Sequence, residues 1–302
     1  MIQDYVKVKD GQIFYSLAGS DSGKGSPIVL LHGNFNDHQI WNEQVGFLSS
    51  HYKIIRYDLR GYGLSSTPKS PFSNVHDLKA LVDSLQLRHM TLIGSSMGSG
   101  VAVDFTLTYP HLVKALILVS PSIHGNKYPM NMMWQGIKNY YNVRLNGREQ
   151  AIQSFITNPF WQYFFPSLDR PAAREKVILN VRNTNNFCRF SPSLAKTDIK
   201  LLAIHRLSEI IIPTLIIISD RDHPFNIKAA ETLHTSIKRS SKIIMKNCGH
   251  LPFIEAPHEF NQTVLDYLSG QSFQNNFMNE KDCCINQIRR TATTPDDNSH
   301  IY

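Results

Sequence analysis

Short apolar runs rich in Ile, Leu and Val recur along the chain, and each run ends in a turn or a helix-like segment. Strands that are covered on both faces read as nearly continuous apolar runs, so these segments predict the buried strands of a parallel sheet. They span residues 27–33, 52–61, 90–98, 114–121, 213–220 and 241–250. An earlier segment, residues 11–19, alternates more regularly and predicts an antiparallel edge strand.

Helix-like segments separate several of these runs. Residues 74–85 place apolar side chains on one stripe at helical spacing, and residues 101–110 continue from a Gly-rich turn to a proline. Residues 257–270 begin with Pro and end in Gly, as helices commonly do. This alternation of strands and helices predicts an α/β fold with a mostly parallel, doubly wound sheet.

One long interval breaks the alternation. No strand is expected in residues 121–210, which instead hold 12 aromatic residues. We therefore expect a helical insertion here, between two parts of one core formed by residues 1–120 and 211–270. Residues 271–302 are polar with little periodicity, so we expect a disordered tail there.

The composition fits a globular protein rather than a membrane or disulfide-rich one. The first residues lack the basic and then apolar pattern of a secretory signal, and no stretch approaches the roughly 20 apolar residues of a membrane span. The four cysteines form no disulfide framework, and no Cys/His spacing matches a zinc site. We expect a cytoplasmic protein with reduced thiols and without a transmembrane segment, a metal or a cofactor; the role of the adjacent Cys283 and Cys284 stays open.

The net charge of +7 is unevenly distributed along the chain. Residues 121–210 hold 12 Lys and Arg against 5 Asp and Glu, which leaves the rest of the chain balanced. No nucleic-acid-binding motif accompanies these cations, which are scattered among aromatic residues, so we expect no nucleic-acid partner. Three interpretations stay open: a solvated basic surface, which is the simplest, a surface that meets an anionic membrane, or a site that attracts a small anionic substrate.

A candidate nucleophile lies in the sequence Gly94-Ser95-Ser96-Met97-Gly98, a G-x-S-x-G match. In this pattern a tight strand-to-helix turn lifts the serine hydroxyl clear of the sheet, and the flanking glycines avoid clashes with the backbone. The match follows a predicted strand and opens a predicted helix, which is the context that the pattern requires. Ser96 is therefore the expected nucleophile, and the flanking glycines of Ser95 have the wrong offsets.

A serine hydroxyl needs a base, and the base needs a carboxylate to hold its tautomer. His250 follows the last predicted strand, at the sheet edge where the other strands end in turns. Asp220 and Asp222 follow the preceding strand; Asp222 lies further into the loop and is the expected partner of the imidazole. The order nucleophile, acid, base is the one found in α/β-hydrolases.

With these residues in place, the chain resembles the α/β-hydrolase fold superfamily of serine hydrolases across residues 10–270. The resemblance is carried, in the correct order, by "LLHGN" (30–34), "DLRGYGLSS" (58–66), "GSSMG" (94–98), "PTLIIISDRD" (213–222) and "NCGHLPFIEAP" (247–257). It implies an oxyanion hole formed by the backbone N–H groups of Asn34 and Met97, and a structural role for His32. It also implies that Asp58 and Arg60 brace nearby loops.

The resemblance further implies that the insertion at 121–210 is a helical cap, which covers the pocket and sets specificity. Within the family the chain is most similar to small-molecule carboxylesterases, enol-lactonases and C–C bond hydrolases. Haloalkane dehalogenases and epoxide hydrolases use an aspartate where this chain has Ser96. Ser219 and Cys248 depart from the residues common at their positions, but neither belongs to the expected triad.

The leading hypothesis is hydrolysis of a small-molecule carboxylic ester through an acyl-enzyme on Ser96. Cleavage of an enol-lactone or a C–C bond, and acyl or peracid transfer, use the same residues and stay open as alternatives. A ligand receptor built on this fold is a third class, disfavoured because all three triad candidates are present. The sequence leaves the substrate and the oligomeric state open.

Overall fold

The computed structural model describes residues 1–19, 25–183, 185–187, 192–196 and 202–270. The chain divides into two units, Met1–Asn261 and Gln262–Tyr302, and the description below concerns the first. Of the second unit, residues 262–269 form the last part of helix α9 (Pro257–Ser269). The tail expected at 271–302, with Cys283 and Cys284, lies outside the described residues, as does Cys188.

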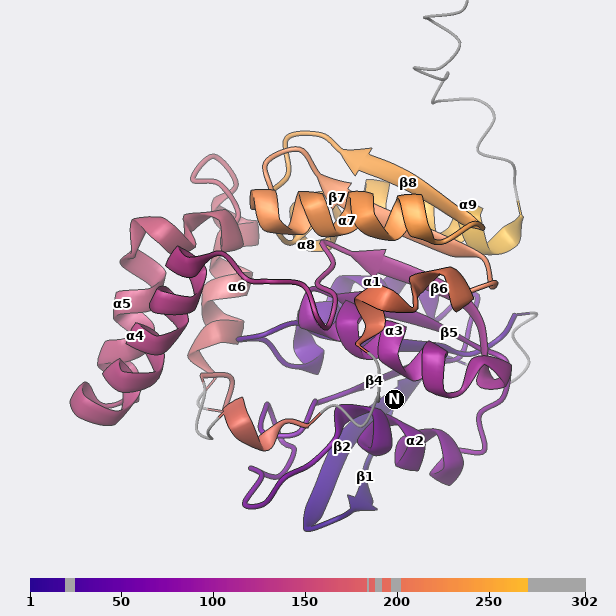
Figure 1. Ribbon diagram of the computed structural model, residues 1–302, viewed down its shortest axis with the longest axis horizontal. Helices are drawn as coiled ribbons and strands as arrows, with labels where there is room; N and C mark the ends of the chain where they lie inside the picture. The colour runs from indigo at the N-terminus through magenta and orange to yellow at the C-terminus, as the bar shows by residue number, and fades with distance from the viewer. Residues whose placement is uncertain (20–24, 184, 188–191, 197–201, 271–302) are drawn as a thin grey trace, which may run out of the picture. The chain divides into compact units, whose positions relative to one another are not determined.

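The described residues form one sheet of eight strands, in the order β1-β2-β4-β3-β5-β6-β7-β8 (Figure 1). The strands are β1 (Ile2–Val8), β2 (Gly11–Ala18), β3 (Ile28–Leu31), β4 (Ile54–Tyr57), β5 (Met90–Ser95), β6 (Val113–Val119), β7 (Thr214–Ser219) and β8 (Ser240–Met245). In this sheet order, each neighbouring pair of strands from β4 through β3 to β8 is parallel. Strand β2 is antiparallel to both of its neighbours, β1 and β4. The predicted mostly parallel sheet is confirmed.

The prediction that residues 11–19 form an antiparallel strand is confirmed, but its placement at the edge is wrong. Strand β1 pairs along the outer side of β2 and takes the edge position. Only Val6 of β1 is buried, so the strand carries almost none of the apolar signal that marks the others. A strand covered on so little of its surface leaves no clear pattern in the sequence.

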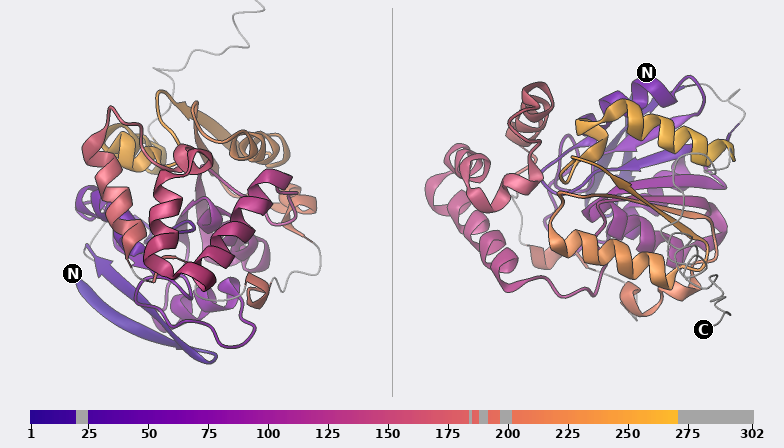
Figure 2. Two further views of the ribbon diagram at one scale, coloured as in Figure 1. Left: turned by 90° about the vertical axis from the view of Figure 1, so that its left-hand side faces the viewer. Right: turned by 90° about the horizontal axis from the view of Figure 1, so that it is seen from above.

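Helices cover both faces of the sheet. On one face, α2 (Asn74–Ser84), α3 (Met97–Thr108) and α7 (Pro224–Ser236) share a buried apolar cluster with alternate residues of the strands. Those strand residues include Leu31, Leu92 and Leu118, since successive side chains of a strand point to opposite faces. On the other face lie α1 (Asn42–Leu48) and α8 (Pro252–Glu255) (Figure 2).

Between β6 and β7 the described residues form helices and contribute no strand to the sheet. The helices are α4 (Met130–Asn146), α5 (Arg148–Thr157) and α6 (Pro171–Arg182), with 3₁₀ turns η3 (Pro159–Phe164), η4 (Pro192–Leu194), η5 (Ala203–His205) and η6 (Leu207–Glu209). Helices α4 to α6 lie beyond the carboxyl ends of the parallel strands (Figure 1). We call residues 121–210 the cap; its boundaries stay a prediction.

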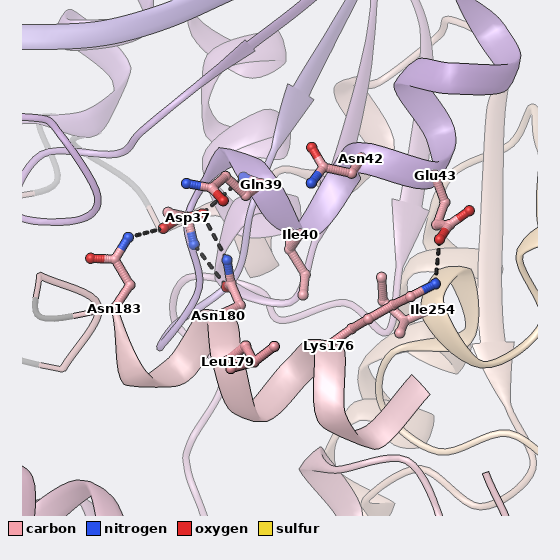
Figure 3. A pocket seen from close by; sticks show the side chains of 10 residues that line it. All are labelled: Asp37, Gln39, Ile40, Asn42, Glu43, Lys176, Leu179, Asn180, Asn183 and Ile254. Atoms are coloured by element: carbon pink, nitrogen blue, oxygen red, sulfur yellow. Dashed lines mark hydrogen bonds and ion pairs between the residues drawn. The ribbon is translucent and has the colours of Figure 1, made fainter. Parts of the chain in front are cut away.

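A buried aspartate in the loop after β3, Asp37, fastens this loop to the cap. The carboxylate of Asp37 accepts hydrogen bonds from the amides of Asn180 (2.7 Å) and Asn183 (2.6 Å) (Figure 3). It accepts a third from the amide of Asn186 at 3.0 Å. It also accepts the backbone N–H of Gln39 at 2.8 Å and thereby caps the turn that follows. Three amides from one segment thus compensate a charge that is fully removed from water.

We predict that Asp37→Ala lowers the free energy of unfolding by about 3 kcal/mol or more, because it leaves buried amides without their charged partner. Denaturant titration measures the change. The matched control is Lys176→Met, which removes an exposed ion pair with Glu43 beside the same loop (Figure 3). That change should cost about 1 kcal/mol or less. Equal effects of the two variants would contradict a structural role for Asp37.

Candidate active site

Ser96 occupies a strained turn between β5 and α3. Its backbone has φ of 51° and ψ of −116°, a conformation that side chains other than glycine rarely adopt. The turn is held on its sheet side by the Ser96 N–H, which donates to Val119 O at 2.9 Å. The Ser96 carbonyl accepts the hydroxyl of Ser122 at 3.1 Å. The surrounding backbone thus maintains a conformation that projects the Ser96 side chain from the sheet edge.

Two glycines permit this turn. A Cβ on Gly94 would lie 2.5 Å from the carbonyl oxygen of Gly98. A Cβ on Gly98 would lie 2.4 Å from the carbonyl oxygen of Leu31, at the end of β3. Both distances are far below a van der Waals contact with rigid backbone, so both positions require glycine.

The two adjacent serines have different environments. Ser95 is fully buried and its hydroxyl has no hydrogen-bond partner. Ser96 is partly exposed and lines a cavity beneath the cap. A substrate in that cavity can therefore reach Ser96 but not Ser95.

Asp222 and His250 meet across the turns that follow β7 and β8. The His250 Nδ1 lies 2.8 Å from the Asp222 Oδ1, and both side chains are buried. This hydrogen bond directs Nδ1–H toward the carboxylate and leaves Nε2 as the nitrogen that can accept a proton. Asp220 is exposed and makes no contact of this kind. The structure thus brings together the acid and base that the sequence selected.

The loop carrying His250 is held by the cap and by α8. The His250 N–H donates to Tyr163 O at 3.1 Å, and the Gly249 N–H donates to Glu255 Oε1 at 2.8 Å. Burial raises the pKa of Glu255. The ion pair with Arg170 of the cap, at 3.7 Å, acts in the opposite direction and lowers this pKa. The main chain that leads into His250 is therefore positioned by Tyr163 of the cap and by Glu255 of α8.

The expected oxyanion loop lies against Ser96, the expected nucleophile. A Cβ on Gly33 would lie 3.1 Å from the Ser96 Cβ, so the loop after β3 closely approaches the turn. Asn34 lines the cavity, and its side-chain oxygen accepts the hydroxyl of Tyr62 at 2.7 Å. Met97 begins α3, where backbone N–H groups have no acceptor within the helix.

His32 is structural. Its Nδ1 lies 2.8 Å from Gly33 O, and its Nε2 accepts the N–H of Leu59 at 3.0 Å. Because both ring nitrogens are used and complete burial lowers the pKa of His32, the imidazole is held neutral. It ties the oxyanion loop to the turn after β4.

Asp58 and Arg60 brace the neighbouring loops, as the resemblance implied. Asp58 accepts the backbone N–H of His38 at 2.7 Å and that of Leu64 at 2.8 Å. Arg60 forms a two-pronged contact with Asp77 at the start of α2. Neither residue lines the cavity.

The only metal-like cluster among the described residues is Asp37, His38 and Asp58, whose candidate ligand atoms lie within 4.8 Å of one another. Both carboxylates already accept several hydrogen bonds, and the His38 Nδ1 lies 2.8 Å from Asp58 Oδ1. The donor set is therefore engaged in fastening loops and does not fit a metal. A second pair, the partly exposed His124 with the buried Asp104, lies outside the cavity. Although burial acts to lower the pKa of His124, the hydrogen bond to Asp104 and its charge raise it.

The cavity has a volume of about 290 Å³, at the small end of the range for small-molecule sites. Core residues supply its base, including Ser96, His250 and Asn34. The cap and Phe225 supply most of the wall. The large wall residues are Tyr128, Met132, Met133, Trp161, Tyr163, Phe164 and Phe225. No Lys or Arg belongs to the lining formed by the described residues.

Several wall residues could not be selected from the sequence. Tyr163 touches both the cavity and the His250 loop, and burial, aided by the charge of Asp222, raises its pKa well above the usual range. Phe35 of the oxyanion loop packs on Phe155 and Phe187 of the cap, with ring centroids 4.5 and 5.3 Å apart. The aromatic richness of residues 121–210 was the available signal, but it did not indicate which rings face the cavity.

The described part of the chain has no helix with the length and apolar character needed to cross a bilayer.

Comparison with known proteins places this geometry in a family. A family model described as alpha/beta hydrolase fold matches residues 26–257. The 2-hydroxy-6-oxononadienedioate/2-hydroxy-6-oxononatrienedioate hydrolase 1 of Pseudomonas putida is 29% identical over 288 residues, covering 88% of this chain and 96% of that protein. The pimeloyl-[acyl-carrier protein] methyl ester esterase of Aliivibrio salmonicida is 27% identical over 249 residues, covering 81% of this chain and 93% of that protein.

Among solved structures, the enol-lactonase from Burkholderia xenovorans LB400 superposes with a TM-score of 0.73 at 22% identity, covering 88% of this chain and 100% of that chain. At this identity the similarity concerns the fold alone. The family match, by contrast, covers most of this chain, and the curated relatives are hydrolases. The chain therefore belongs to the alpha/beta hydrolase fold family and is an enzyme of the hydrolase class.

Proposed function

We propose that this enzyme hydrolyses a small-molecule carboxylic ester through an acyl-enzyme on Ser96. The observation that carries the proposal is the hydrogen bond between His250 and the buried Asp222, because His250 lines the same cavity as Ser96. That arrangement supplies a nucleophile, a base and a group that orients the base.

In the first half-reaction the Ser96 hydroxyl oxygen attacks the ester carbonyl carbon while His250 Nε2 takes the hydroxyl proton. The backbone N–H groups of Asn34 and Met97 stabilise the oxyanion that forms, a contribution of about 3 kcal/mol per donor in comparable sites. His250 then returns the proton to the departing alcohol. Asp222 stabilises the imidazolium formed between these two steps.

In the second half-reaction water replaces the alcohol. His250 Nε2 takes a proton from water, the hydroxide attacks the acyl carbon, and the proton passes to Ser96 as the acid leaves. Cleavage of an enol-lactone requires the same atoms. Transfer of the acyl group to another nucleophile differs only in what attacks the acyl-enzyme.

The wall of the cavity supports an apolar, uncharged acyl group. The lining formed by the described residues is aromatic and methionine-rich and has no Lys or Arg. Burying a carboxylate there without a cation would cost several kcal/mol. The Pseudomonas putida relative is named for a substrate with two carboxylates, so this lining argues against the same substrate here.

Ser96→Ala should lower kcat for p-nitrophenyl esters by about 10⁴-fold or more, because it removes the acyl acceptor. The matched control is Ser95→Ala, which deletes a buried hydroxyl that has no partner and should leave kcat and stability nearly unchanged. Labelling with a fluorophosphonate should modify Ser96 alone. Label on another serine, or full activity of Ser96→Ala, would overturn the proposal; absence of label and turnover together would favour a receptor.

Asp222→Asn should lower kcat by about 10⁴-fold, because the amide favours the wrong tautomer of His250. Asp220→Asn, two residues away on the exposed side of the loop, should retain nearly full activity. Steady-state kinetics of the two variants compares them directly. A larger loss in Asp220→Asn would show that the acid is assigned to the wrong residue.

A matched pair of esters separates two of the three interpretations of the cap's charge. We expect kcat/KM for an ester with a neutral alkyl acyl group to exceed that for its ω-carboxylate analogue by about tenfold or more, at both low and high salt. If the cap cations instead attract an anionic substrate, the carboxylate ester will be preferred at low salt and will lose that preference at high salt.

A further inference from the structure

Helix α4 exposes a continuous apolar stripe. Successive residues of an α-helix are rotated by about 100°, so six large side chains of α4 fall within one arc of roughly 120°. They are Met130, Met133, Trp134, Ile137, Tyr141 and Leu145, with exposed fractions of 72, 52, 58, 44, 57 and 79%. Asn139, the one residue of α4 that is buried, lies on the opposite side. We call these six residues the α4 stripe.

Two cations accompany the stripe. Lys138 lies just outside one border of the arc and Arg144 lies within it, toward the other border; both are exposed. The guanidinium of Arg144 lies over the ring of Tyr140, with its carbon 5.2 Å from the ring centroid. Residues 130–146 contain no Asp or Glu. The outer face of α4 is therefore mainly apolar, with two cations and no acidic residue.

The same helix forms part of the cavity wall. Met132, Met133 and Gly136 line the cavity that holds Ser96 and His250. Met133 belongs to both the wall and the α4 stripe, so the stripe begins at the cavity. Helices α4 and α5 lie on the side of the cap away from the sheet (Figure 2).

We propose that α4 docks on an anionic lipid surface, with the α4 stripe entering the interface between headgroups and acyl chains. A helix with aromatic and aliphatic side chains on one face, and Lys or Arg beside them, is the type that lies in this interface. Lys138 and Arg144 then face the lipid phosphates, where each cation near an anionic surface is favourable. An exposed apolar face of this size calls for a partner of this kind.

A second copy of the chain fits the stripe less well. A symmetric dimer brings the same patch of each subunit together, so Lys138 and Arg144 would lie against a second α4 that has no acidic residue to compensate them. An anionic surface complements both the apolar arc and its two cations.

Docking at this place gives an apolar ester a short path from the lipid phase into the cavity. This consequence rests on the proposed function, whereas lipid binding itself does not. Lipid binding is therefore measured without a substrate. If the enzyme proves inactive toward soluble esters, the proposed function fails, but the lipid-binding measurement still tests this proposal.

The tryptophans of the chain make the test direct. Of the three, Trp41 and Trp161 are buried, at 0 and 6% exposure, while Trp134 is 58% exposed and lies on the stripe. Adding vesicles of equimolar phosphatidylcholine and phosphatidylglycerol to the full chain should shift the emission maximum to shorter wavelength. Trp134→Phe should abolish the shift while the protein still floats with the vesicles. An unchanged spectrum of the wild-type chain would overturn the proposal.

Flotation measures the contributions to binding. Trp134→Ser/Leu145→Ser should weaken the partition onto these vesicles by about tenfold or more. The matched control, Leu168→Ser/Ile211→Ser, removes two apolar side chains that are also strongly exposed (81 and 71%) but lie outside α4, and should bind as the wild type does. Lys138→Glu/Arg144→Glu should remove the preference for phosphatidylglycerol over pure phosphatidylcholine.

Two outcomes would overturn the proposal in favour of another occupant. If the wild type fails to float and instead forms a dimer that Trp134→Ser/Leu145→Ser dissociates, the stripe is an interface between copies of the chain. If the control pair loses as much binding as the stripe pair, the attraction is a general property of the surface and not of α4.

Discussion

The close approach of α3 to the end of β3 is the constraint on which the site depends. Gly98 lies against the carbonyl oxygens of Leu31 and His32, where any side chain would collide with backbone. This contact brings the turn that carries Ser96 next to Gly33 and the loop that follows it. The proposed nucleophile and the proposed oxyanion loop are therefore positioned by the backbone of the central strands, the most deeply buried part of the sheet.

The cap covers the cavity and also helps to position the loops around it. Asn180, Asn183 and Asn186 surround Asp37, which lies three residues beyond Asn34. On the other side of the cavity, the carbonyl of Tyr163 accepts the N–H of His250. The cap thus holds both loops between which a substrate would lie. A change in the cap would alter the positions of these loops as well as the shape of the wall.

The sheet and the cap supply different parts of the candidate active site. The sheet supplies the turns after β5, β7 and β8, and the family shares that framework across hydrolases of different substrates. The wall of the cavity, and with it the fit of a substrate, comes largely from side chains of α4 and of the segment around Trp161. Because α4 presents one face to the cavity and another to the exterior, substrate fit and surface attachment are linked in one helix.

The sequence by itself determined the parallel strands, the turn at Ser96 and the order of Ser96, Asp222 and His250, because these follow from local patterns: buried apolar runs, flanking glycines and polar residues at strand ends. It misplaced the edge of the sheet, since β1 buries little more than Val6 and carries no clear pattern. Only the tertiary structure decided that Asp37 binds asparagines in and just after α6, that Tyr163 holds the His250 loop, and that the α4 stripe is exposed. Each depends on contacts, or their absence, between residues far apart in the chain, which periodicity along the sequence does not encode.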